Sequence, residues 1–213
     1  DDVAWKNGDR IAFLGDSITQ AGARGNGYVN RIEAAVNQSS QGKAVEFVKA
    51  GISGHKVPDL LARVDRDVLS KKPTITFVYI GINDVWHFAM KNRQGTSLDA
   101  FEAGLDELVV RLKAGGSDVV LATPSVIGEK RAGENTQDGE LDRYAAASRR
   151  IATKHGLVLC DLRRDFQDRL ELLNHEDAAR GILTSDGVHL NDAGNAFVAG
   201  RVAVALRTAL ARR

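Results

Sequence analysis

The fold is decided by the stretch Arg10-Ile-Ala-Phe-Leu-Gly-Asp-Ser-Ile-Thr19, close to the start of the chain. Residues 11–14 form a short apolar run, which predicts a buried strand because it is too short for a helix. Gly15 and Asp16 end this run, and Ser17 follows at the carboxyl end of the predicted strand. Open α/β sheets bind ligands at that end, so Ser17 is a candidate nucleophile. The alternative is that Ser17 or Asp16 only caps the next helix, and this stretch alone favours the cap.

Composition places the chain among ordinary globular proteins. It has 213 residues, of which 43% are hydrophobic and 27% charged, so we expect a single domain over residues 1–213. The net charge of +1, with acidic and basic residues interspersed, gives no basis for binding nucleic acid, and no apolar run is long enough to span a membrane. The single cysteine, Cys160, follows apolar residues and is expected to be a buried structural thiol.

Neither the oligomeric state nor the compartment can be inferred from these properties. The first residue is Asp1, which fits a secreted or periplasmic protein whose leader has been removed. A chain that was merely shortened would begin in the same way, so both readings stay open.

Five strand-like segments alternate with helical patterns along the chain. The predicted strands cover residues 11–14, 44–48, 74–80, 118–122 and 157–160. The predicted helices cover residues 28–39, 57–69, 97–115, 141–155, 165–173 and 191–211, and residues 128–140 are expected to be a surface loop. This alternation predicts an α/β fold, a three-layer α/β/α sandwich around a parallel sheet. The simplest arrangement is the flavodoxin-like strand order 2-1-3-4-5.

This strand order brings polar groups from three turns to one edge of the sheet. The turns after strands one, two and three carry Ser17, Gly54 and Asn83, and His189 lies three residues after Asp186 in a late loop. Acyl transfer through a serine needs a base, a group that orients the base, and hydrogen-bond donors for the oxyanion. These five residues supply all three requirements, so the combination favours a nucleophilic Ser17 although each signal alone is weak.

A second Asp-x-x-His pair, Asp84 and His87, follows the third predicted strand. Its aromatic neighbours, among them Trp86, indicate a pocket wall. His87 is therefore expected to contact the substrate and not to act as the catalytic base. His55 adjoins Gly54 and is likewise expected to lie at the rim of the site. We therefore take His55, Trp86 and His87 as candidate substrate contacts. Asp16 is included with them, although its main expected role is to shape the turn before Ser17.

Four segments of the chain resemble the conserved blocks of the GDSL, or SGNH, hydrolase family, and in particular its small acetylesterase-like members. They are Gly15-Asp-Ser-Ile-Thr19, Ala50-Gly-Ile-Ser-Gly54, Gly81-Ile-Asn-Asp84 and Asp186-Gly-Val-His189, in the family order. The second block departs from the common pattern, because Lys49 stands where an Asn is often found.

The resemblance implies an SGNH hydrolase fold and a metal-free, cofactor-free serine esterase. It assigns the triad to Ser17, His189 and Asp186, and the oxyanion hole to the Ser17 N–H, the Asn83 amide and a glycine N–H. That glycine is expected to be Gly54, with Gly51 as the alternative. Many relatives remove acetyl groups from carbohydrate, so the expected activity is O-acetylester hydrolysis on a sugar or polysaccharide.

Several other functions remain open from the sequence. Within the family these are a lipase, a lysophospholipase or an acyl-thioesterase. Outside it they are a metal-dependent phosphoesterase and a non-catalytic module that binds a glycan or a flavin. Three aromatic side chains, Tyr28, Trp86 and Phe88, are candidates for stacking on a sugar ring.

Overall fold

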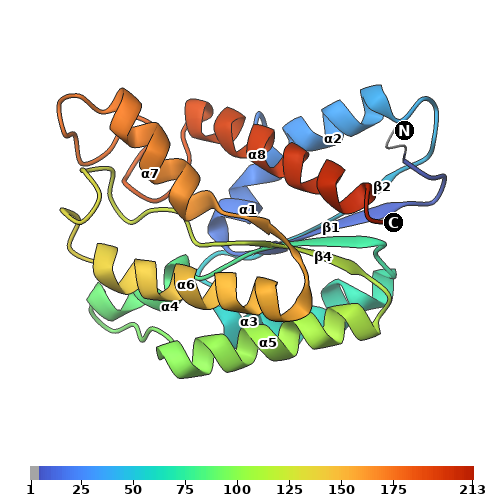
Figure 1. Cartoon of the computed structure of the whole chain (residues 1–213), viewed down its shortest axis with the longest axis horizontal. Helices are drawn as coiled ribbons and strands as arrows, with labels where there is room; N and C mark the ends of the chain where they lie inside the picture. Colours follow the sequence, from blue (N-terminus) through green and yellow to red (C-terminus); the bar gives the residue numbers. More distant parts are fainter. Residues whose placement is uncertain (1–4) are drawn as a thin grey trace.

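A single five-stranded parallel sheet forms the centre of the molecule (Figure 1). The computed structural model describes residues 5–213. The strand order is β2-β1-β3-β4-β5, which confirms the predicted order. The strands are β1 (Arg10–Gly15), β2 (Glu46–Gly51), β3 (Ile75–Tyr79), β4 (Asp118–Ala122) and β5 (Val158–Cys160).

The sheet is covered by helices on both faces, so the three-layer prediction is confirmed. In Figure 1, helices α1 (Ser17–Gly22), α2 (Tyr28–Ser39), α7 (Leu162–Leu173) and α8 (Asp192–Leu210) lie above the sheet. Helices α3 (Val57–Asp67), α4 (Ile82–Trp86), α5 (Leu98–Ala114) and α6 (Asp138–His155) lie below it. Two short 3₁₀ turns, η1 (Leu69–Lys71) and η2 (His87–Ala89), complete the elements. None of the helices in residues 5–213 is long and apolar enough to cross a membrane.

The central strands are buried because their side chains are apolar on both faces of the sheet. Every residue of β3 is buried, as expected for a strand between two layers of helices. Phe13 of β1 and Phe77 of β3 pack edge-to-face with Tyr28 of α2. Tyr28 is fully buried in this aromatic cluster, so it cannot stack on a sugar, and that prediction is wrong.

The predicted boundaries hold where local signals are strong. Helix α2 and strand β4 have the predicted bounds, and the side chains of Ser97 and Asn191 cap α5 and α8. The second strand was predicted over 44–48, but it begins two residues later, at Glu46, and ends three residues later, at Gly51. Helix α6 begins at Asp138, inside the segment predicted as a loop.

The parallel sheet places the functional turns together. Strand β1 pairs with both β2 and β3, so the turns after these three strands leave the same edge of the sheet side by side. Helix α4, which the sequence did not predict, starts directly after β3 and carries Asn83 in its first turn. The edge therefore collects Ser17, Gly54 and Asn83.

Candidate active site

Ser17 is the first residue of α1, at the carboxyl end of β1. The Asp16 side chain caps this helix, because its Oδ1 accepts a hydrogen bond of 2.9 Å from the Ile18 N–H. Ser17 itself is only half-buried, which leaves its hydroxyl accessible. The N–H groups in the first turn of a helix have no acceptor within the helix, so the Ser17 N–H is free to bind an anion. Asp16 therefore caps α1, and the Ser17 side chain is not needed as the cap.

The side chains of Ser17, His189 and Asp186 form a continuous hydrogen-bonded chain. Ser17 Oγ lies 2.9 Å from His189 Nε2, and His189 Nδ1 lies 2.7 Å from Asp186 Oδ2. The carboxylate can only accept at Nδ1, so Nδ1 carries the proton and Nε2 is free to accept from the Ser17 hydroxyl. The predicted base, orienting acid and nucleophile are brought together in the order that acyl transfer requires.

Backbone donors fix the second oxygen of Asp186. Its Oδ1 accepts from the Val188 N–H at 2.9 Å and from the His189 N–H at 2.7 Å. Burial acts to raise the pKa of Asp186, but the hydrogen bonds from His189 and Val188 hold it below its ordinary value. Asp186 therefore stays ionised beside the imidazole, although the side chains of both residues remain accessible to solvent.

Asn83 is buried and points its amide toward the turn after β2. Its Nδ2 donates a hydrogen bond of 3.0 Å to the His55 carbonyl. An amide nitrogen carries two hydrogens, so one of them stays available to a ligand. The same turn contains Gly54, whose φ of +79° suits glycine and whose N–H has no acceptor among residues 5–213.

Gly51, the alternative to Gly54, lies where β2 and α1 are in close contact. It is the last residue of β2, and a Cβ at this position would lie 2.3 Å from the backbone N of Gln20 in α1. A glycine here allows the helix to approach the strand closely. Packing between β2 and α1 thus explains why residue 51 is a glycine.

The buried guanidinium of Arg63, from α3, ties the turns together, and sequence reasoning missed it. Arg63 donates to the Gly15 carbonyl at 2.9 Å and to His55 Nδ1 at 3.0 Å, and it forms an ion pair with Asp67 at 3.2 Å. Arg63 therefore contacts the residue that ends β1 and the residue whose carbonyl holds Asn83. Arginine side chains are mostly exposed to solvent, so the residue type gave no reason to expect this role.

Two of the predicted substrate contacts are corrected by their burial. Asp16 is 2% exposed and His87 4% exposed, so neither side chain is open to a ligand. Burial, together with the nearby Asp84 carboxyl, raises the pKa of Asp16 to about 7. Burial and then the neighbouring Arg93 lower the pKa of His87, whose Nε2 lies 3.2 Å from Arg93 Nη1.

The remaining rim residues keep some exposure. His55 and Trp86 are half-buried, and Phe88 is exposed. The Trp86 ring meets the His189 ring edge-on, with the two centroids 5.9 Å apart. An aromatic ring thus adjoins His189, and the side chains of His189 and Asp186 remain partly accessible to solvent.

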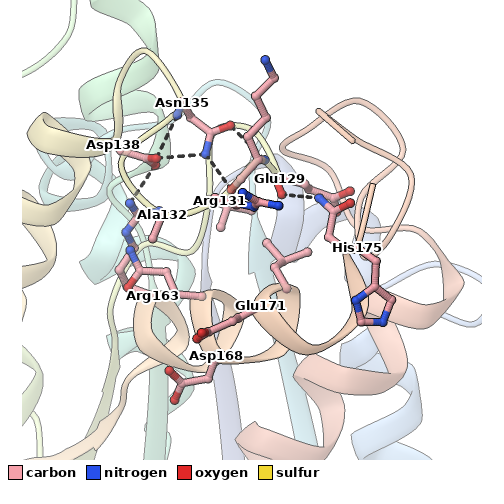
Figure 2. A pocket seen from close by; sticks show the side chains of 15 residues that line it. Glu129, Arg131, Ala132, Asn135, Asp138, Arg163, Asp168, Glu171 and His175 are labelled. Atoms are coloured by element: carbon pink, nitrogen blue, oxygen red, sulfur yellow. Dashed lines mark hydrogen bonds and ion pairs between the residues drawn. The ribbon is translucent and has the colours of Figure 1, made fainter. Parts of the chain in front are cut away.

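A cavity of about 580 Å³ lies elsewhere, between α7 and the segment 126–138 (Figure 2). It is lined by Glu129, Arg131, Asp138, Arg163 and His175, among others, and by none of the predicted site residues. Within residues 5–213 no three His, Cys, Asp or Glu side chains are grouped so that they could hold a metal ion. The metal-dependent phosphoesterase therefore lacks a ligand set in the described part of the chain.

Comparison with known proteins agrees with this geometry. The model of the GDSL-like Lipase/Acylhydrolase family matches residues 13–197. The chain belongs to this family. An acetylxylan esterase from Geobacillus stearothermophilus is 30% identical to it over an alignment of 207 residues, and the match covers 91% of this chain and 91% of that one.

Similar solved structures have the same fold. The crystal structure of an acetyl xylan esterase, AlAXEase, has a TM-score of 0.87 and 40% identity, covering 92% of this chain and 99% of that one. LAE5, an α/β hydrolase from the metagenome of Lake Arreo, Spain, has a TM-score of 0.82 and 30% identity, covering 97% and 98% of the two chains. The GDSL chain described here is therefore a carboxylic ester hydrolase with the SGNH hydrolase fold.

Proposed function

We propose that this GDSL hydrolase is a serine esterase that removes acetyl groups from carbohydrate, with Ser17, His189 and Asp186 as its catalytic triad. The observation that carries the proposal is the hydrogen-bonded chain from Ser17 Oγ through His189 to Asp186, at 2.9 and 2.7 Å. We further propose that residues 1–213 form one hydrolase domain, because all five strands belong to one sheet.

In the first half of the reaction Ser17 Oγ attacks the carbonyl carbon of the ester, and its proton moves to His189 Nε2. The Asp186 carboxylate stabilises the imidazolium through the hydrogen bond at Nδ1. When the tetrahedral intermediate collapses, the bond to the sugar oxygen breaks and His189 returns the proton to that oxygen. The deacetylated sugar leaves, and the acetyl group stays on Ser17.

In the second half a water molecule takes the place of the sugar hydroxyl. It gives a proton to His189 Nε2 and attacks the acetyl carbonyl, and a second tetrahedral intermediate forms. Its collapse releases acetate and returns the proton to Ser17. Over both halves one ester bond and one water are converted to an acid and an alcohol.

Three donors are proposed to stabilise the oxyanion of both intermediates. They are the Ser17 N–H at the start of α1, the Gly54 N–H and the second hydrogen of the Asn83 amide. Gly54 is preferred to Gly51 because its N–H is free within residues 5–213 and it adjoins His55, whose carbonyl binds Asn83, whereas Gly51 packs against the backbone of α1. Preorganised donors of this kind commonly supply the largest part of catalysis by acyl-transfer enzymes.

The proposed substrate class rests on the relatives and on the rim of the site. Two of the relatives described above are acetylxylan esterases. The half-buried Trp86 ring lies beside His189, and the half-buried His55 lies beside Gly54 and binds Asn83 through its carbonyl, so an aromatic and a polar group border the proposed site. Such groups suit a sugar ring that carries an acetyl ester.

The test is a panel of p-nitrophenyl esters of rising chain length, run beside acetylated xylan and acetylated monosaccharides. The expected result is highest kcat/KM on acetyl esters, release of acetate from at least one carbohydrate, and no turnover by Ser17→Ala. A strong preference for long acyl chains would indicate a lipase, and a preference for thioesters an acyl-thioesterase. Hydrolysis that survives in Ser17→Ala would overturn the proposed triad.

A further inference from the structure

The loop that carries Asp186 and His189 is closed at its base by backbone contacts. Thr184 and Leu190 form an isolated antiparallel bridge, and the Asn191 N–H donates to the Leu183 carbonyl at 3.0 Å. The two proposed catalytic side chains thus lie at the tip of a short closed loop. The position of the tip relative to Ser17 depends on what holds the base.

The base of this loop is held by Glu129, a carboxylate from the segment after β4. Glu129 is 0% exposed, and its two oxygens accept three consecutive backbone N–H groups. Oε1 accepts from Leu183 at 2.7 Å and from Thr184 at 2.6 Å, and Oε2 accepts from Ile182 at 2.7 Å. Charge-assisted hydrogen bonds of this length are about twice as strong as neutral ones.

A second contact joins the same two segments one residue away. The Gly128 N–H donates to the Gly187 carbonyl at 2.8 Å, and the Gly187 N–H donates to Thr184 Oγ1 at 3.0 Å. A Cβ on Gly187 would lie 3.4 Å from the Cα of Gly128, which shows how closely the backbones run. Gly187 lies directly after Asp186, so this contact reaches the tip of the loop.

Glu129 is itself fixed from the opposite side. Its N–H donates to the Ala179 carbonyl at 3.0 Å, and its carbonyl accepts from Asn174 Nδ2 at 2.6 Å. In Figure 2 Glu129 lies to the right of Asp138 and Asn135 among the residues that line the cavity. Its carboxylate therefore reaches the triad loop from a backbone that is already held.

We infer that Glu129 is a positioning residue, which sets the distance between His189 and Ser17 through the backbone of residues 182–184. The inference rests on the proposed triad. Thr184 is two residues from Asp186, and three N–H groups directed at one carboxylate fix both the place and the direction in which the chain enters the loop. A displacement of about 1 Å between reacting groups can cost about 10²-fold in rate.

The test compares Glu129→Gln and Glu129→Ala with a matched control, Asp138→Asn. Asp138 is also a buried carboxylate beside the same cavity, and it accepts from the Gly133 and Asn135 N–H groups and from Arg163. Its partners do not include the triad loop. All three variants are measured for urea unfolding, for kcat and KM on p-nitrophenyl acetate, and for the rate at which a fluorophosphonate labels Ser17.

The expected result is a fall in kcat and in the labelling rate with little change in KM. The fall should be about 10²-fold for Glu129→Ala, and smaller for Glu129→Gln, which keeps one carbonyl oxygen. Asp138→Asn should lose stability but retain both rates. Glu129→Gln keeps the volume of the side chain, so it carries the test if Glu129→Ala does not fold.

Two results would overturn the inference. One is wild-type kcat and labelling in a folded Glu129 variant. The other is an equal fall in the Asp138→Asn control. Ser17→Ala and His189→Ala are assayed alongside: turnover retained in them refutes the triad itself, whereas turnover lost in them but kept in the Glu129 variants refutes only the positioning role.

Discussion

Because the Asn83 amide carries two hydrogens, we predict that Asn83→Ala lowers both the free energy of unfolding and the rate of hydrolysis. One hydrogen is bound to the His55 carbonyl at 3.0 Å, and the other is proposed to bind the oxyanion. The first contributes to the folded state, whereas the second acts only while the oxyanion exists. The substitution should therefore affect stability and rate by different and separable amounts.

The loss of stability and the loss of rate differ in size. A single hydrogen bond to the half-buried His55 is worth about 0.5–1.5 kcal/mol of unfolding free energy. Loss of one oxyanion donor costs about 2.7–4 kcal/mol of transition-state stabilisation, or about 10²–10³-fold in kcat. KM should change little, because the ground-state ester carries no oxyanion.

The assay pairs urea unfolding with steady-state hydrolysis of p-nitrophenyl acetate. Thr76→Val is the matched control. Thr76 lies in β3, the strand that precedes Asn83, and its hydroxyl makes a buried hydrogen bond of 2.8 Å to Ser117, which is not a residue of the proposed site. The control should lose stability and keep its kcat. A kcat for Asn83→Ala within a few-fold of the wild type would remove Asn83 from the oxyanion hole.

Three further predictions concern the support of the site. The pKa of Asp16 is raised from 3.8 to about 7, so the folded state retains a proton that the unfolded state has lost, and wild-type stability falls as pH rises between these values. Asp16→Asn has no such proton, so its stability relative to the wild type should improve with rising pH in urea unfolding; a pH-independent difference would contradict this. Arg63→Met removes the guanidinium donor from the Gly15 carbonyl, which still accepts from the Ile52 N–H at 3.1 Å. The unfolding free energy should fall by about 1.5–3 kcal/mol, the range for a hydrogen bond to a charged group, and no measurable loss would contradict the role of Arg63. Gly51→Ala places a methyl against the Gln20 backbone and should cost about 1–3 kcal/mol in thermal unfolding, and an unchanged melting temperature would show that α1 can move.

The sheet and the pairing of Asp186 with His189 were predictable because local signals indicated them. The β-branched and aromatic run 74–80 has few conformations other than a strand, and β1 and β3 bring their turns together once the sheet is parallel. The pair Asp186 and His189 lies within one loop, so its geometry depends little on the rest of the chain. The Ser17–His189 contact spans 172 positions in sequence, and the strand order did not predict it; His189 was assigned from its spacing to Asp186 and from the resemblance to the family.

The supporting residues were not predictable in the same way. Arg63 and Glu129 are charged residues of types that are mostly solvent-exposed, and nothing near them in the sequence marks them as buried. Their burial is stabilised by partners that are distant in sequence: the Gly15 carbonyl for Arg63, and the N–H groups of residues 182–184 for Glu129. The exposure of Asp16 and His87 was misjudged for the same reason, because proximity to the site in sequence does not fix which way a side chain faces.

The most direct test of the account is to trap the acyl-enzyme. The protein is mixed with p-nitrophenyl acetate, quenched in acid during turnover, digested and analysed by mass spectrometry. We expect an acetyl group on the peptide that contains Ser17, and none in Ser17→Ala or His189→Ala. Full hydrolytic activity in Ser17→Ala, or an acetyl group carried during turnover by another residue instead, would contradict the assignment of Ser17 as the nucleophile.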